Sequence, residues 1–273
     1  MDIQELLKRE TRVNLEQWCT RAAQAVYVGD GRVLARVLGK YLLYVHGSDL
    51  SLAPHLMLDG YWEIWVTMAI ANYIQPGMRC IDVGANVGYY SVLLADWVGA
   101  AGHVHAVEAD PFNAARLRLN LKKLGNATVV EAAAWDEAGE APLFMQDVHE
   151  GDHTLRGDVE ERFKERGLLG TRSVKTVRLE TVVEAPVDFI KLDIEGAERR
   201  AWVGMREILH NSPRVQIAAE WTRKYDPDYE LLRLAQEDGF KTFDIGGDGK
   251  LKPLAATELA DASIDWRMLW FKR

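Results

Sequence analysis

The first residues whose types and spacing could do chemistry lie in a short glycine-containing motif, Asp82-x-Gly84-x-Asn86-x-Gly88. An apolar run precedes the motif, and apolar residues at helical spacing follow it. The pattern predicts a strand, a tight loop and a helix, the opening unit of a nucleotide-binding α/β sheet. Glycines at 84 and 88 would let the backbone turn sharply and approach a ligand without a Cβ in the way.

The loop does not match the motifs for dinucleotides or for phosphate groups. In Gly-x-Gly-x-x-Gly, the second and third glycines would stand where this chain has Asn86 and Tyr89. Tyr89 would block the approach of a pyrophosphate to the helix N-terminus, and no Gly-Lys-Ser/Thr follows. Asp82, two positions before the first glycine, instead suits a cationic ligand. S-adenosylmethionine (SAM) carries a sulfonium, an ammonium and a carboxylate, and we expect it as the cofactor.

Two further predicted strands, 103–108 and 127–134, carry residues that suit the rest of SAM. Glu108 ends the first, where a carboxylate can accept hydrogen bonds from both ribose hydroxyls. A bare carboxylate at the end of a buried strand would otherwise lack a partner, which favours this role. Small residues up to Ala134 leave room for a flat adenine, and Trp135 could stack on it or line that slot.

A strand predicted over 187–193 places Asp193 at its carboxyl end, beside the glycine loop. Ligands of α/β sheets bind at this edge, so Asp193 is a candidate for both cofactor binding and catalysis. Glu195 follows in the next loop, and Glu220 and Trp221 stand at the end of a strand predicted over 214–220. We expect these three residues to face the acceptor.

Three segments in this order, 82–91, 107–111 and 189–198, resemble the FkbM family of SAM-dependent methyltransferases. The Lys-Leu-Asp-Ile-Glu-Gly-Ala-Glu run is the most specific of them, and segments 58–63 and 151–153 are also similar to that family. The resemblance implies a Rossmann-like sheet and O-methylation, commonly of a sugar hydroxyl or a natural-product alcohol. Methyltransferases often have a helix before the first strand that closes over SAM. Residues 59–75 predict such a helix, with Asp59 as N-cap, Glu63 facing the cofactor and Tyr61 facing the acceptor.

Attack of an alcohol on the methyl group of SAM is helped by a base, and His153 in a polar loop is our candidate. Asp152 or Glu195 would orient its ring. The alternative is assistance by a hard cation such as Mg²⁺, held by Asp193, Glu195 and Glu220. We expect no metal, because the same acids suit a cationic cofactor. An N-methyltransferase and a non-catalytic SAM-binding or nucleotide-binding protein remain alternatives, and an NAD-linked oxidoreductase is disfavoured.

Charge and composition narrow the partners. With 33 Lys and Arg against 41 Asp and Glu, the net charge is −8, which disfavours binding to nucleic acid. The N-terminus is unlike a signal peptide, and the most apolar stretch, 61–74, is too short to span a bilayer. Cys19 and Cys80 lack metal-ligand spacing and are expected to be reduced and buried. We expect a cytoplasmic protein with a small-molecule or glycan acceptor, no membrane partner, and possibly a homodimeric assembly.

The elements that position these residues form an α/β fold: a Rossmann-like, seven-stranded class I methyltransferase sheet with helices on both faces. Residues 1–58 are expected to form an extension of helices (2–28) and a short hairpin (32–38 and 41–46). Residues 59–273 would be the methyltransferase domain, with an insertion at 136–187. Further expected elements are helices at 110–124, 159–166 and 228–237 and strands at 173–179, 240–245 and 264–271.

Overall fold

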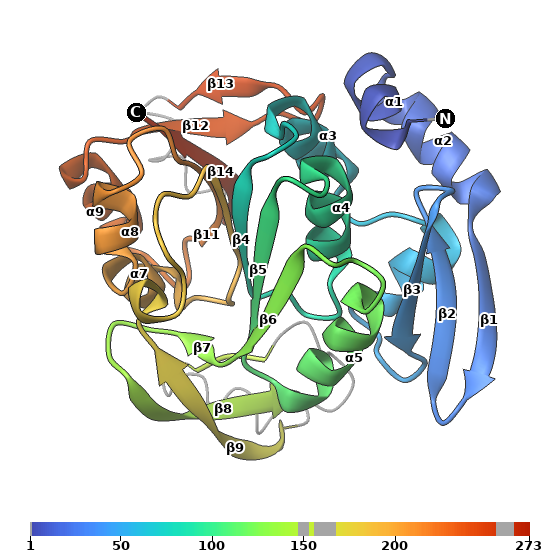
Figure 1. Cartoon of the computed structure of the whole chain (residues 1–273), viewed down its shortest axis with the longest axis horizontal. Helices are drawn as coiled ribbons and strands as arrows, with labels where there is room; N and C mark the ends of the chain where they lie inside the picture. The colour runs from blue at the N-terminus through green and yellow to red at the C-terminus, as the bar shows by residue number, and fades with distance from the viewer. Residues whose placement is uncertain (1, 147–152, 156–167, 255–264) are drawn as a thin grey trace.

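A computed structural model of the chain describes residues 2–146, 153–155, 168–254 and 265–273 (Figure 1). The central sheet comprises β4 (Arg79–Val83), β5 (His103–Glu108), β6 (Ala127–Glu131), β10 (Phe189–Leu192), β11 (Gln216–Thr222), β12 (Lys241–Ile245), β13 (Leu251–Pro253) and β14 (Trp266–Lys272). Among the described residues its spatial order is β13-β12-β14-β11-β10-β4-β5-β6. Neighbours from β11 to β6 pair in parallel, and β14, β12 and β13 pair antiparallel. The seven predicted strands are all present, and β13 is an addition that the sequence did not predict.

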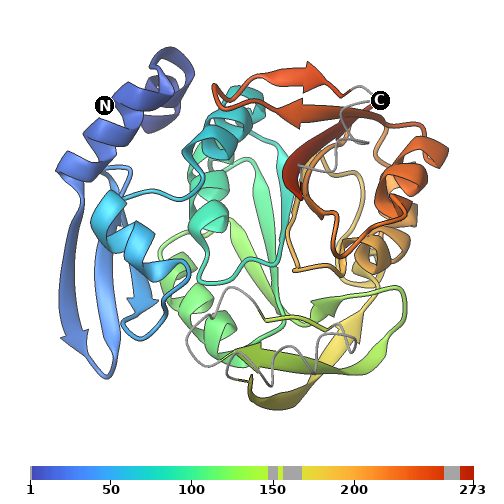
Figure 2. The same cartoon turned by 180° about the vertical axis from the view of Figure 1, so that it is seen from behind.

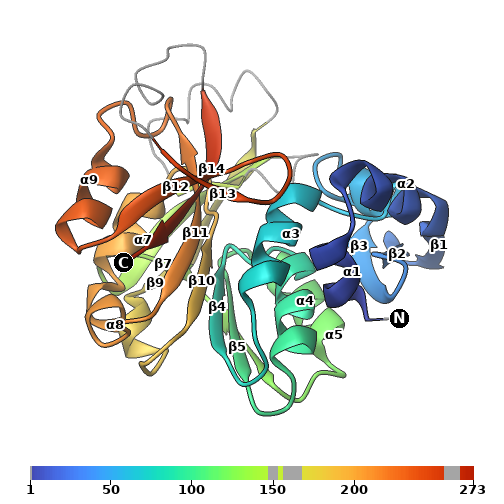
Figure 3. The same cartoon turned by 90° about the horizontal axis from the view of Figure 1, so that it is seen from above.

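Helices cover both faces of this sheet, as the sequence predicts (Figure 3). On one face lie α3 (Ile64–Tyr73), α4 (Tyr89–Val98) and α5 (Pro111–Leu121), and on the other α7 (Glu198–Val203), α8 (Arg206–His210) and α9 (Glu230–Glu237). Alternate side chains of a strand point to opposite faces, so β4 supplies Cys80 to one hydrophobic cluster and Ile81 to the other. The site must therefore lie at an edge of the sheet, because both faces are filled.

The N-terminal extension contains α1 (Ile3–Arg9), α2 (Arg12–Ala22) and an antiparallel sheet of β1 (Gln24–Gly29), β2 (Arg32–Val37) and β3 (Tyr41–His46). The helical prediction for 2–28 was wrong at its end, because residues 24–29 form a strand. Their β-branched and aromatic side chains favour extended backbone, and Val26 is exposed rather than part of a helical stripe. Figure 2 shows this small sheet standing beside the central one. The division into domains at residue 58 stays a prediction.

The helix predicted over 59–75 begins later than expected. A π-helical turn occupies His55–Asp59, so Asp59 ends a turn instead of capping a helix. Glu63, in a left-handed conformation with φ of +37°, precedes α3, which starts at Ile64. Tyr61 therefore lies before the helix and not on it.

The insertion supplies β9 (Leu168–Val177) and β8 (Gly139–Gln146) to a separate small sheet, and the third strand of that sheet, β7 (Ala133–Ala134), lies just before the insertion. The strand predicted over 127–134 is thus divided, since β6 stays in the central sheet and β7 pairs with β9. The strand predicted at 173–179 overlaps with the second half of β9, which ends earlier, at Val177. The helix predicted at 159–166 lies outside the described residues.

Two further findings concern the cysteines and the membrane. Cys19 and Cys80 are buried and free of any disulfide, as predicted. Within the part of the chain that the structure describes, no helix is long and apolar enough to cross a bilayer.

The turn after β4 passes very close to the end of the neighbouring strand β10. Gly84 has a φ of +80°, and a Cβ there would overlap with the backbone carbonyl oxygen of Asp193, at the end of the neighbouring β10. The backbone N–H of Asp193 donates to the carbonyl of Val83 at 3.0 Å, which fixes the two strand ends against each other. Glycine at 84 is therefore required by strand packing.

We expect Gly84→Ala to lower the free energy of unfolding about 1–3 kcal/mol more than Gly77→Ala does, because overpacking adds to backbone strain. Gly77 is a matched control, since its φ is +86° and nothing lies within 4 Å of the position that a Cβ would take there. Denaturant unfolding of both variants measures the difference. Equal losses of unfolding free energy in the two variants would show that the backbone at this crossing can shift without a further loss of stability.

Candidate functional site

A cleft opens at the carboxyl edge of the parallel strands, where β4, β5 and β10 end. Its lining includes many of the residues singled out from the sequence: Gly84, Asn86, Glu108, Ala134, His153, Asp193 and Glu195. Ala132 and Ala133 lie beside Ala134 in the wall, so the predicted row of small residues does face the cleft. Carboxylates, an amide and small apolar residues therefore share one concave surface, as a nucleoside-type ligand requires.

Glu108 holds the glycine loop in place. Its Oε2 accepts a hydrogen bond from the backbone N–H of Asn86 at 2.8 Å, and its Oε1 accepts from that of Asp110 at 2.8 Å. The premise that this carboxylate would lack a protein partner was wrong, because the loop returns to it. Burial raises the pKa of Glu108 to about 7 in spite of these two donors. The group lines the cleft while it orders the backbone around it.

Gly88 and Asp82 do not reach the cleft lining that the described residues define. Gly88, with a φ of +97°, precedes α4, and a Cβ there would lie 2.6 Å from Cδ1 of Leu117 in α5. Its role is helix packing, which corrects the expectation of close approach to a ligand. Asp82 is 1% exposed, and its Oδ2 accepts from Ser91 Oγ at 2.5 Å. Burial raises its pKa to about 6, and its predicted contact with the cofactor stays a prediction.

A buried cation lies among these acids. Lys191 is 1% exposed, and its Nζ contacts Oδ2 of Asp193 at 2.7 Å and lies 4.9 Å from the centre of the Tyr90 ring. The Tyr90 hydroxyl donates to Oε2 of Glu63 at 2.9 Å. Burial lowers the pKa of Lys191, but Asp193 and Glu63 outweigh burial and the pKa is raised. Lys191 thus stays charged. Sequence reasoning noted it on the strand but gave it no role.

Glu63 belongs to this buried network more than to the cleft wall. Its carboxyl group lies behind Tyr90, which does line the cleft. Burial raises the pKa of Glu63 to about 7, and the nearby ammonium of Lys191 opposes that rise. Its predicted contact with the cofactor stays a prediction.

The loop after β10 is closed by Glu198, a residue that sequence reasoning left without a role. Its Oε1 accepts from the backbone N–H groups of Ile194 at 2.9 Å and Gly196 at 3.2 Å. The loop places Glu195 in a left-handed conformation with φ of +54° at the cleft. Burial raises the pKa of Glu198 to about 7. The family-like run of residues 191–198 therefore folds as one self-capped turn.

His153 reaches the cleft from the insertion. The neighbouring Thr154 exchanges backbone hydrogen bonds with Phe144 and donates through Oγ1 to the carbonyl oxygen of Glu195 at 2.9 Å. The His153 side chain is 12% exposed, and its Nδ1 lies 3.8 Å from Oδ2 of Asp110. Asp110, which caps α5, thus joins the acids near this ring, a contact that the sequence did not indicate. Asp152, the other predicted orienting acid, lies outside the described residues.

A second cavity adjoins the cleft, and the two share Leu155 and Ala197 in their walls. It takes in three residues predicted from the sequence: Trp135, Glu220 and Trp221. The Trp135 ring lies under the guanidinium of Arg200, 4.9 Å from its centre, so it faces this cavity and not the small-residue slot. Tyr61 lines neither cavity as the described residues define them, and packs partly buried against the core.

Trp221 and Glu220 form the deep side of the second cavity. Trp221 is 1% exposed, stacks on Tyr229 and donates through Nε1 to Oδ2 of Asp226 at 3.1 Å. Glu220 accepts a hydrogen bond on Oε1 from Trp266 Nε1. Burial, followed by the charges of Asp193 and nearby glutamates, raises the pKa of Glu220 well above its usual value. The predicted contacts of both residues with an acceptor stay predictions.

Glu198→Gln isolates the pH dependence that this buried carboxyl confers on stability. The folded pKa is about 7 against a usual 4.5, so between these values the folded protein binds the extra proton and its stability falls as pH rises. Glutamine keeps the accepting Oε1 without the charge. We expect the free energy of unfolding of the variant to rise relative to that of the wild type through this pH window, by up to about 1.4 kcal/mol per pH unit. Urea unfolding of the SAM-free proteins at several pH values measures the difference.

Glu137→Gln, at an exposed position, is the control for that series and should leave the difference flat. A Glu198→Gln difference that is equally flat from pH 5 to about pH 8 would contradict the buried, protonated carboxyl.

Comparison with known proteins bears on the family. A model of the FkbM methyltransferase domain matches residues 82–242, more than half of the chain. A protein-L-isoaspartate O-methyltransferase of Aeropyrum pernix is 48% identical over 62 residues, which are 23% of this chain and 24% of that protein. The chain thus spans about a quarter of the length of that curated relative.

One solved structure is similar to this chain in its fold. A Pyrococcus horikoshii protein named as a transferase superposes with a TM-score of 0.50 at 12% identity, covering 90% of this chain and 72% of that one. The FkbM methyltransferase of Methylobacillus flagellatus gives a TM-score of 0.46 at 14% identity, covering 77% of this chain and 54% of that one. The matched domain contains the glycine loop, Glu108 and the whole 191–198 turn. The chain belongs to the FkbM family of SAM-dependent methyltransferases.

Proposed function

We propose that this protein transfers the methyl group of SAM to a hydroxyl oxygen of a sugar, a glycan or a natural product. The observation that carries the proposal is the pair of adjoining cavities, which share Leu155 and Ala197. The first has small residues and a strand-end carboxylate, which suit a nucleoside. The second combines aromatic rings with carboxylates and guanidinium groups, which suit a polar ring with several hydroxyls.

In the proposed complex, the adenine lies against the Ala132–134 wall and Glu108 accepts hydrogen bonds from the ribose. The excess of acids near Asp193 favours the sulfonium and ammonium groups of SAM. The methyl group then points toward the junction of the two cavities. Alignment of the acceptor oxygen with the S–CH3 bond supplies much of the rate enhancement.

His153 is the base in this proposal. As the acceptor oxygen forms its bond to the methyl carbon, the S–CH3 bond breaks and its electron pair returns to sulfur, leaving S-adenosylhomocysteine. The hydroxyl proton passes to the imidazole. Support comes from the place of His153 in the cleft lining and from Asp110, whose carboxylate lies 3.8 Å from Nδ1 and can stabilise the imidazolium that forms.

Glu108→Gln should weaken SAM binding at least tenfold, since a charge-assisted hydrogen bond contributes about 1.5–3 kcal/mol. Titration calorimetry measures the affinity. Glu131→Gln is the matched control. Glu131 lies opposite Glu108 in the backbone pairing of β5 with β6, but its side chain binds Arg118 at the surface. The 2′-deoxy analogue of S-adenosylhomocysteine tests the contact itself: it should bind more weakly than the parent compound to the wild type, but not to the variant. An equal loss in both proteins would place Glu108 away from the ribose.

His153→Ala should lower kcat by roughly 10²–10⁴-fold with SAM affinity nearly unchanged, the usual effect of losing an acid–base group. The limb of the wild-type pH–rate profile that belongs to the His153 imidazole should vanish in the variant. Assays with labelled SAM and a panel of sugar and alcohol acceptors measure both. His210→Ala, at the exposed end of α8, is the control. Near-normal kcat in His153→Ala would remove the base from the proposal and leave catalysis to orientation alone.

A further inference from the structure

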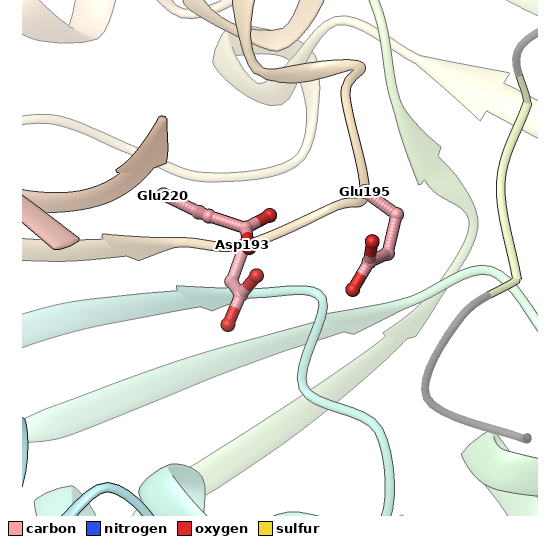
Figure 4. A group of neighbouring side chains, drawn as sticks. All are labelled: Asp193, Glu195 and Glu220. Carbon is pink, nitrogen blue, oxygen red and sulfur yellow. The ribbon is translucent and has the colours of Figure 1, made fainter. Parts of the chain in front are cut away.

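Three carboxyl groups converge where the two cavities meet. Asp193, Glu195 and Glu220 each offer an oxygen, and these oxygens all lie within 4.8 Å of one another. Figure 4 shows the side chains pointing toward a common space from the end of β10, from the loop after it and from the end of β11. Three carboxyl groups at this separation would repel one another when ionised, and a cation held between them would remove that repulsion.

Glu220 adds an independent sign of a missing ligand. The residue is 9% exposed, and one oxygen, Oε1, accepts from Trp266 Nε1. The other oxygen, Oε2, is buried and has no hydrogen-bond partner in the described part of the chain. A buried carboxylate oxygen left without a partner is costly, and its side chain points into the acidic cluster (Figure 4).

Lys191 binds one carboxylate of this cluster. Its ammonium contacts Oδ2 of Asp193, so the second oxygen of that carboxylate can still act as a ligand. Hard cations such as Mg²⁺ and Mn²⁺ take carboxylate oxygens and water, and Mg²⁺ commonly keeps several waters.

We propose that Asp193, Glu195 and Glu220 form a divalent-cation site between the cofactor cleft and the acceptor cavity. Asp193 and Glu195 line the first, and Glu220 lines the second. An acceptor hydroxyl that replaces one metal-bound water would be held beside the methyl group and would lose its proton more readily. This use of the cation rests on the proposed function, whereas the binding site itself does not. It takes up the cation-assisted alternative that the sequence left open beside the expected metal-free reaction.

The test measures Mn²⁺ binding to the full chain in the absence of SAM and acceptor. Bound Mn²⁺ is detected as a loss of the free-ion signal in electron paramagnetic resonance, and Mg²⁺ is then added as a competitor. The wild type should bind one Mn²⁺ per chain. Glu220→Gln keeps the acceptor for Trp266 and should weaken binding at least tenfold, and Glu195→Gln should do the same. Glu137→Gln, an exposed acid outside the cluster, should bind as the wild type does. Near-ultraviolet circular dichroism checks that each variant is folded.

The proposal is overturned if the wild type binds no Mn²⁺ up to about 1 mM, the weak end of the range for carboxylate sites. It is also overturned if Glu220→Gln and Glu195→Gln bind as tightly as Glu137→Gln does. SAM titration of the same proteins keeps the two proposals apart. A wild type that binds Mn²⁺ but not SAM keeps the cation site and refutes the proposed function. A wild type that binds SAM but not Mn²⁺ refutes the cation site and keeps the proposed function.

Discussion

The site depends on the buried ammonium group of Lys191 and its ion pair with Asp193. The ammonium is held between Asp193 and the face of Tyr90, and Tyr90 in turn binds Glu63. A buried ion stays charged only where partners replace its water, and the ammonium in turn offsets the repulsion between Asp193 and Glu63. Strand β10 sets this geometry, because residues 191 and 193 are two apart and point to the same side. Burial of this one cation thus holds several acids close together at the edge of the sheet.

The crossing of β4 and β10 converts that charge arrangement into a binding surface. Gly84 lets the first loop lie against the carbonyl of Asp193, and Glu108 ties the same loop to β5 through the Asn86 N–H. Glu198 fixes the loop on the other side by accepting two backbone N–H groups. Three adjacent strand ends are therefore joined by short polar contacts, and the cleft between them is largely preformed. This is the edge at which open α/β sheets bind ligands.

Local sequence patterns predicted which residues lie at the carboxyl ends of the strands. They did not predict contacts between segments that are far apart in the sequence. The carboxyl ends of parallel strands lie at one edge, so spacing alone brought Glu108 and Asp193 into one cleft. Sequence spacing does not show which side chain packs against a glycine, so the packing of Gly88 against Leu117 was not predicted. Asp110 beside His153 was likewise unforeseeable, because the insertion must fold back over α5 first. The strand at 24–29 was missed because apolar residues there also fit a helical period.

A crystal structure with S-adenosylhomocysteine tests the central claim most directly. The account predicts the ribose hydroxyls within hydrogen-bonding distance of the Glu108 carboxylate and the adenine against Ala132–134. The thioether sulfur should face the junction at Leu155 and Ala197, where the two cavities meet. A ligand bound elsewhere, or one whose sulfur faces away from the second cavity, would contradict the assignment of the two cavities to cofactor and acceptor.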